Sequence, residues 1–327
     1  MHKIRRRLMF ACGLQAMLGT PMVARASGFP ERPLKLIMAY PPGGGADQWA
    51  RIIARPLEAQ LGQPIVFDYR PGGSATSAAD AAARAANDGY TIHMIDSTAL
   101  AYVPNLRRVS YDPTKSFTPL GYVGAVPMCI VATPSISVRS VEELVALASK
   151  KPGQLNCASA GVGSPHHLIA EFFKIRAGIR IGHIPYKGAT QYLSDLAAGQ
   201  VQLAVSTIAP AVPYVQSGRL RVLGVTTAQR VSAMLDVPTI AEQGYPGFDE
   251  KPWSCFVAPT GLPSAVLERL RAALQTVLGS DEVAAALRQV GLEDIHGLAV
   301  EKVSGRIAED LAKWKMVIQQ AGITLES

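Results

Sequence analysis

Residues 34–53, LKLIMAYPPGGGADQWARII, contain the pattern that decides the fold. The apolar run 34–39 predicts a strand, and the amphipathic run 46–61 predicts a helix. Three consecutive glycines at 43–45 join the two. A strand that passes through a glycine-rich loop into a helix is typical of βαβ units, whose strands pair in parallel.

The same alternation continues along the chain. One set of apolar and amphipathic runs covers 34–95 and a second covers 128–225, with the Pro-rich, irregular segment 103–119 between them. The chain then returns to long helices, predicted at 263–278, 281–290 and 299–321. The pattern predicts an α/β protein with two lobes, each a mostly parallel sheet flanked by helices.

The order of the two sets predicts an inserted domain. The first lobe is expected to contain 27–126 and 228–327, the second lobe 127–227, and residues 1–26 belong to neither. Two chain segments then cross between the lobes, and such a pair of crossings forms a hinge.

The chain has 327 residues, of which 48% are hydrophobic and 17% charged, so it contains ample material for a core. Its net charge of +7 arises mainly at the N-terminus, since residues 1–26 contain five basic and no acidic residues. The remainder has 27 basic against 25 acidic residues. Without a basic stripe, nucleic acid is not expected as a partner.

The N-terminus has the pattern of an export signal. The basic stretch 1–7 precedes the mostly apolar stretch 8–23, and Ala24-Arg25-Ala26 supplies the small residues of a cleavage site. This order predicts a signal peptide cleaved before Ser27. A membrane anchor is the alternative, but the apolar run is short and interrupted for a span of about 20 residues.

Three cysteines follow the predicted signal, at Cys129, Cys157 and Cys255. They are well separated and form no CxxC pair, which excludes a zinc knuckle or a thioredoxin-type motif. Either one disulfide or three buried thiols fits this spacing.

The first glycine-rich loop is a candidate anion site. Tyr40 precedes Gly43, Gly44 and Gly45, and Asp47 follows them at the predicted helix start. Glycines let a ligand approach the backbone, and the free N–H groups of a helix N-terminus favour an anion. The spacing is neither a P-loop nor a dinucleotide fingerprint. Asp47 as a helix cap, and the loop as a simple turn, are the alternatives.

A second loop with the same order of elements lies at 159–167. Ser159, Gly161 and Gly163 follow a predicted strand, Ser164 is placed as a helix N-cap, and Pro165 begins the helix. A tight turn is again the alternative. If the lobes face each other, both helix N-termini point into one cleft, because ligands of open α/β sheets bind at the carboxyl ends of strands.

The remaining motifs give no catalytic constellation. Tyr186 and Lys187 offer an aromatic wall and a charge, or else a surface turn. His93 lies in an apolar run, typical of a core residue, and the adjacent His166 and His167 diverge by about 100° on a helix. There is no nucleophile elbow and no HExxH motif. The sequence therefore predicts a binding protein without catalytic residues, metal or cofactor.

The mature chain resembles the substrate-binding receptors of tripartite tricarboxylate transporters, the Bug or TctC family. The resemblance covers about 28–325 and rests on short motifs in a shared order. These motifs are FPERP at 29–33, YPPGGGAD at 40–47, RPGG at 70–73, DGYT at 88–91, YDP at 111–113, GVGS at 161–164, IPYKG at 184–188 and DVPT at 236–239.

The resemblance implies a two-lobed periplasmic binding protein that closes like a flytrap on a small carboxylate. The carboxylate would lie between the two glycine-rich loops, with Ser97 as a further contact. The residues that the resemblance assigns to the site are Tyr40, Gly43, Gly44, Gly45, Asp47, Ser97, Ser159, Gly161, Gly163, Ser164, Tyr186, Lys187 and Ser206. Many family members have Asp where this chain has Ser206, which favours a plain carboxylic acid over a cationic ligand or an amino acid.

The resemblance also implies partners. A small carboxylate and membrane transporter subunits are expected, and the receptor is expected to be a monomer. A sensor that presents its closed form to a membrane histidine kinase is the first alternative. An exported enzyme on the same scaffold is the second.

Overall fold

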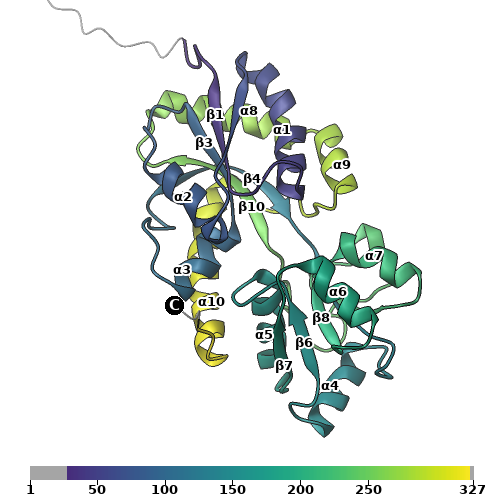
Figure 1. Ribbon diagram of the computed structural model, residues 1–327. Coiled ribbons are helices and arrows are strands. Elements are labelled where there is room, and N and C mark those ends of the chain that lie inside the picture. Colours follow the sequence, from purple (N-terminus) through teal and green to yellow (C-terminus); the bar gives the residue numbers. More distant parts are fainter. Residues whose placement is uncertain (1–27, 325–327) are drawn as a thin grey trace, which may run out of the picture.

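The computed structural model describes residues 28–324 and contains two lobes, each with its own five-stranded sheet (Figure 1). The sheet of the first lobe has the order β2-β1-β3-β10-β4, and that of the second β7-β6-β8-β5-β9. The strands of the first sheet are β1 (Leu34–Met38), β2 (Ile65–Tyr69), β3 (Thr91–Asp96), β4 (Phe117–Ala125) and β10 (Trp253–Pro259). Those of the second are β5 (Met128–Ala132), β6 (Asn156–Ser159), β7 (Gly182–Pro185), β8 (Leu203–Thr207) and β9 (Arg221–Val225).

The predicted two-lobed α/β fold with mostly parallel sheets is confirmed, and each sheet contains one reversed strand. In the first sheet β10 runs antiparallel to both β3 and β4. In the second sheet β5 runs antiparallel to both β8 and β9. These antiparallel strands are the ones along which the chain enters a lobe from the other lobe: β5 when it enters the second lobe, and β10 when it returns to the first. Strand β10 was missing from the sequence prediction, which passed from 225 directly to the long helices.

Helices cover both sheets (Figure 1). They are α1 (Gly45–Leu61), α2 (Thr76–Ala83), α3 (Val103–Leu106), α4 (Val141–Lys150), α5 (Pro165–Ala177), α6 (Ala189–Ala197), α7 (Ile208–Gln216), α8 (Ser264–Leu278), α9 (Asp281–Gln289) and α10 (Val300–Gln320). Short turns lie at η1 (Gly73–Ala75), η2 (Thr98–Tyr102) and η3 (Ser232–Met234). The segment 103–119 is therefore less irregular than expected, since it begins with α3 and ends in β4.

The last helix packs against both lobes. Near its C-terminal end, the Trp314 ring lies 5.0 Å from Tyr102 of the first lobe and 6.0 Å from Phe172 on α5 of the second. All three side chains are buried, together with Phe248 of the segment between β9 and β10. We propose that the second lobe extends to about 248 rather than 227, because Ile240 and Phe248 belong to its hydrophobic core.

The three cysteines in the described part of the chain are free, buried thiols, so the thiol alternative holds. Burial raises the pKa of Cys129 and Cys157 to about 12. Within 28–324, no helix is both long and apolar enough to span a bilayer. The predicted signal peptide and its cleavage before Ser27 lie outside the described residues.

Candidate functional site

A cavity of about 850 Å³ lies between the lobes. The first lobe contributes residues that follow the carboxyl ends of β1, β2 and β3, and the second lobe contributes the loop after β6 with the first turn of α5. The lining residues are Tyr40, Ser74, Thr98, Val103, Leu106, Arg107, Ala160, Val162, Gly163, Ser164, Pro165 and His166. Both walls thus stand where open α/β sheets bind ligands.

The wall of the second lobe is a glycine-rich loop held by its own hydrogen bonds. Ser164 is the N-cap of α5: its Oγ accepts from the His167 N–H at 3.3 Å and donates to the Gly161 carbonyl at 2.7 Å. Gly161 and Gly163 have φ of 117° and 73°, values that favour glycine. The predicted cap at Ser164 and helix start at Pro165 are confirmed, and the loop presents a preformed helix N-terminus to the cavity.

Two histidines, His167 and His183, stabilise this loop. The Gly163 N–H donates to His167 Nδ1 at 3.1 Å, and His167 Nε2 lies 3.4 Å from the Glu171 carboxylate, which also pairs with Lys174. The His183 ring stacks on His167 with centroids 3.6 Å apart. Burial, and then the neighbouring His167, lower the pKa of His183 to about 4, so this ring is neutral at pH 7.

Ser159 and His183 form a close pair without access to a substrate. Ser159 Oγ lies 2.6 Å from His183 Nε2, within the range of a nucleophile and its base. Ser159 is fully buried, however, and its hydroxyl also contacts the Gly161 backbone at 3.0 and 3.1 Å. The pair therefore fixes the loop rather than attacking a ligand.

His166 lines the cavity, although it was not among the residues predicted for the site. Its Nδ1 is buried and has no hydrogen-bond partner among the described residues. Burial lowers the pKa of His166 to about 4, which keeps the ring neutral. A buried nitrogen without a partner is costly in a folded protein, and a bound ligand would supply the missing hydrogen bond.

The wall of the first lobe is built around the half-buried carboxylate of Asp96. The Tyr40 hydroxyl donates to Asp96 Oδ2 at 2.6 Å, and the Thr98 and Ala99 N–H groups donate to Asp96 Oδ1 at 2.9 and 3.3 Å. Burial raises the pKa of Asp96, and these hydrogen bonds oppose that rise. Asp96 itself does not line the cavity. Its carboxylate instead positions Tyr40 and Thr98, which do line it.

Arg107 is the one charged side chain among the lining residues. It follows α3, and its backbone N–H donates to the Val103 carbonyl at 3.0 Å. Its Nη2 donates to the Gly73 carbonyl at 2.7 Å and approaches Thr76 Oγ1 at 3.3 Å. The sequence analysis missed it, because Arg107 lies in a Pro-rich stretch with no recognised motif.

The first glycine-rich loop lies outside the cavity lining. Gly43, Gly44 and Gly45 are exposed, while Asp47 is 4% exposed. The Asp47 carboxylate accepts from the Gly43 N–H at 2.9 Å, from Arg51 Nε at 3.0 Å and from the Tyr69 hydroxyl at 2.6 Å. Burial raises the pKa of Asp47, but the hydrogen bonds outweigh burial and the net pKa is lowered. Asp47 is therefore not the N-cap of α1, which is Gly44; from the first turn of the helix its carboxylate binds the N–H of Gly43, before the helix begins.

Six other predicted contacts also lie outside the lining, among them Ser159 and Gly161 of the second loop. Ser97 is buried and accepts from the Trp253 N–H at 3.3 Å. Ser206 is buried, accepts from the Tyr192 hydroxyl at 3.0 Å and donates to the Thr207 carbonyl at 2.9 Å.

Tyr186 donates to Asp195 at 3.0 Å, and Lys187 is exposed. Of the thirteen residues assigned from the sequence, Tyr40, Gly163 and Ser164 line the cavity, and the ligand role of the others stays a prediction.

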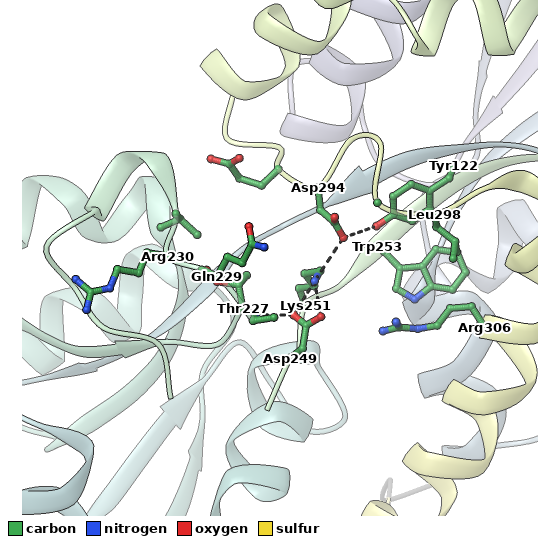
Figure 2. Close-up of a pocket in the computed structure, with 14 residues that line it drawn as sticks. Tyr122, Thr227, Gln229, Arg230, Asp249, Lys251, Trp253, Asp294, Leu298 and Arg306 are labelled. Carbon is green, nitrogen blue, oxygen red and sulfur yellow. Dashed lines mark hydrogen bonds and ion pairs between the residues drawn. The ribbon is translucent and has the colours of Figure 1, made fainter. Parts of the chain in front are cut away.

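A second cavity, of about 330 Å³, lies at the hinge and contains none of the predicted residues (Figure 2). Three of its charged groups pair with each other, while Arg230 and Arg306 pair with carboxylates outside the lining. Lys251 Nζ lies 2.6 Å from Asp249 and 3.4 Å from Asp294, whose carboxylate the Tyr122 hydroxyl reaches at 3.4 Å. Trp253, at the start of β10, forms part of its wall. Its lining contains three basic and three acidic side chains, whereas Arg107 is the one charged side chain in the lining of the cleft.

Within 28–324 no cluster of three or more His, Cys, Asp or Glu side chains is placed to hold a metal ion.

Comparisons with known proteins assign the family. Residues 49–323 match the family model described as tripartite tricarboxylate transporter family receptor. A protein from Pseudomonas sp. strain P51, described as the UPF0065 protein in the tcbD-tcbE intergenic region, is 33% identical over 96% of this chain and 94% of its own length.

Among solved structures, R. palustris Rpa4515 with adipate is 34% identical, has a TM-score of 0.75, and the alignment covers 90% of this chain and 99% of that one. The periplasmic binding protein BugD is 29% identical with a TM-score of 0.72, over 91% of this chain and 100% of that one. The chain therefore belongs to the tripartite tricarboxylate transporter family of periplasmic solute-binding receptors.

Proposed function

We propose that this receptor captures a small organic carboxylate in the cleft between its lobes and delivers it to a tripartite tricarboxylate-type uptake system. The observation that carries the proposal is the charge of the cleft. Its lining contains one cation, Arg107, no carboxylate, and the N-terminus of α5. A helix N-terminus and a guanidinium both stabilise a bound anion. No side chain in the lining carries a negative charge that would stabilise a bound cation.

The solved relative Rpa4515, which contains adipate, supports the same ligand class. The buried Ser159–His183 pair and the neutral His166 supply no accessible nucleophile in the cleft, which favours capture over conversion. We propose that the receptor acts as a monomer in the periplasm. A membrane sensor kinase as its partner is the alternative, and loss of a transcriptional response with intact uptake on gene deletion would identify it.

Thermal unfolding in the presence of mono-, di- and tricarboxylates tests the proposal. A ligand at a hundredfold excess over its Kd adds about 2.7 kcal/mol to the free energy of unfolding, which raises the Tm by several degrees. The uncharged amides of the same acids are the matched ligand control, because they keep the shape and remove the charge. Mass spectrometry of the ligand recovered after binding checks that the protein has not converted it.

The site is tested with two histidine variants. His166→Ala should weaken binding, because the ring lines the cleft, whereas His296→Ala should not, because His296 lies outside the cleft lining and contacts the Leu278 carbonyl at 3.1 Å. A Tm that no carboxylate raises would contradict the proposed function.

A further inference from the structure

We propose that contacts on the back of the hinge form a latch, which holds the lobes apart at the cleft and must open before they close on a ligand. The latch consists of the hydrogen bond between Ser232 and Glu293 and the ion pairs of Lys251 with Asp249 and Asp294. This inference rests on the proposed function, because the latch opposes closure on the captured ligand. The strength of the latch sets the apparent affinity, since a binding-competent state that is rarely populated weakens the observed binding.

The strand orders put the cleft and the latch on opposite sides of the hinge. The walls of the cleft follow β1, β2 and β3 in one lobe and β6 in the other, whereas the chain crosses between the lobes from β4 to β5 and from β9 to β10. Glu293 pairs with Ala125 at the outer edge of β4, and Ser232 follows β9, the edge strand at the same end of the second sheet. A rotation about the crossing segments that narrows the cleft therefore separates Ser232 from Glu293.

The two lobes are joined on the back of the hinge and not across the cleft. Within 28–324, and apart from the crossing segments 126–127 and 249–252, one hydrogen bond links the lobes: the Ser232 hydroxyl donates to Glu293 Oε1 at 2.5 Å. Packing accompanies this bond, because a Cβ added at Gly291 would lie 3.9 Å from the Cβ of Ala209, at the start of α7 in the second lobe. The segment 291–294 is thus the part of the first lobe that the second lobe contacts here.

Lys251 connects the same segment to the second lobe. Its Nζ lies 2.6 Å from Asp249 and 3.4 Å from Asp294, and Figure 2 shows it between the two carboxylates. Asp249 Oδ1 also accepts from the Ala228 N–H at 2.9 Å, so a continuous series of polar contacts runs from one lobe to the other. The Lys251 side chain is 11% exposed, and a pair shielded from water contributes more than an exposed one.

Asp294 has a backbone conformation that few residue types adopt. Its φ is 56°, one of three positive values at non-glycine residues of the described chain. Such a conformation costs free energy and persists where the surrounding contacts fix it, as in segments that switch between two states. Asparagine tolerates positive φ as aspartate does, so Asp294→Asn removes the charge and keeps the backbone.

Spin labels on the two lobes test the latch without any ligand. Val66 on β2 and Ile184 on β7 are exposed, and these are the edge strands at the end of each sheet away from the hinge. The native cysteines of the described chain are buried, so labels attached after Val66→Cys and Ile184→Cys report the width of the cleft. In double electron–electron resonance, we expect Ser232→Ala/Asp294→Asn to raise the population of short distances several-fold.

Calorimetric titration with adipate, which the solved relative Rpa4515 contains, measures the effect on binding. The double variant should bind adipate about tenfold more tightly, because closure no longer breaks a hydrogen bond and an ion pair. Ser110→Ala is the matched control, since it also removes a hydrogen bond from an exposed serine to a carboxylate, that of Asp80, but within the first lobe. Its affinity and label distances should equal those of the wild type.

A disulfide across the same contact tests the reverse effect. Ala209→Cys/Gly291→Cys places two Cβ atoms 3.9 Å apart, within the range of disulfides. The oxidised variant should bind adipate at least roughly tenfold more weakly than the reduced variant, because the bridge prevents the back of the hinge from opening. Reduction of the same sample restores binding and serves as the control for folding.

Unchanged or longer label distances in Ser232→Ala/Asp294→Asn, with an unchanged or weaker affinity, would overturn the latch. Equal affinities of the oxidised and reduced cysteine variants would overturn it as well. If neither adipate nor any other acid binds to the wild type, the proposed function fails, and the label distances measured without ligand still decide on the latch.

Discussion

Substitution of Asp47 separates a structural role from a ligand role. Asp47→Ala removes three hydrogen bonds, from Gly43, Arg51 and Tyr69, to a carboxylate that is 4% exposed. A hydrogen bond to a charged group contributes about 1.5–3 kcal/mol, but Gly43 is exposed and the Arg51 side chain is 56% exposed, so both regain water. We expect a total loss of roughly 2–4 kcal/mol in the free energy of unfolding, most of it from Tyr69.

Urea unfolding at pH 7 measures this loss, and titration with the best carboxylate measures the affinity. The affinity should stay within twofold, because Asp47 lies outside the cleft lining. Asp47→Asn is the matched variant, since it keeps the size and removes the charge.

The pKa of Asp47 is lowered in the folded state, so its contribution is present above its unfolded pKa near 4 and is lost as the pH falls through the folded value. The difference between wild type and Asp47→Asn should therefore shrink below pH 4. A tenfold loss of affinity with unchanged stability would refute this reasoning and restore Asp47 as a ligand contact.

Three further predictions concern the core, pH and backbone strain. Trp314→Ala should lower the free energy of unfolding in urea by about 3–5 kcal/mol, because the ring fills the core shared by both lobes. A loss below about 1 kcal/mol would contradict that packing. Burial lowers the pKa of His93 to about 4, so the unfolded protein binds a proton at this ring more readily than the folded protein, and the free energy of unfolding falls below pH 6.5, by roughly 2 kcal/mol at pH 5. His93→Leu should flatten this dependence of stability on pH, measured by urea unfolding at several pH values. An unchanged dependence would assign it to other groups. Gly73→Ala should destabilise the protein by about 1–2 kcal/mol and weaken carboxylate binding, because the added Cβ crowds Arg107 in the cleft lining. Gly43→Ala, with φ of 86° and open space around it, should add strain without affecting the affinity. Equal affinities of the two variants in calorimetry would show that Gly73 has no part in binding.

The sequence predicted those parts of the site that depend on local order. Ser164 followed by Pro165 marks a helix start in any context, so the cap and the glycine-rich loop before it were placed correctly. The first glycine-rich loop has the same local pattern, yet it lies outside the cavity lining. The difference depends on how the lobes are oriented, which no local pattern records.

Arg107 and β10 show why other parts were missed. Arg107 reaches the cleft because η2 and α3 carry the chain there from β3, and its contact to Gly73 spans 34 positions. The run 253–259 is apolar but follows an irregular connection, and its strand pairs with partners more than 120 positions earlier in the chain. Interactions at such separations come from tertiary packing, which overrides local signals.

The position of β10 has a consequence for the order in which the protein acquires its structure. The first sheet has a gap between β3 and β4 until residue 259 has been synthesised, and the second lobe lacks Trp314 until nearly the whole chain is complete. Contacts between distant segments form slowly, because the closure of long loops costs entropy before any contact repays it. We therefore expect nascent chains that stop before about 250 to remain sensitive to protease. We expect a polypeptide with this topology to complete its fold only after synthesis, and an unfolded chain is the state that can pass through a membrane pore.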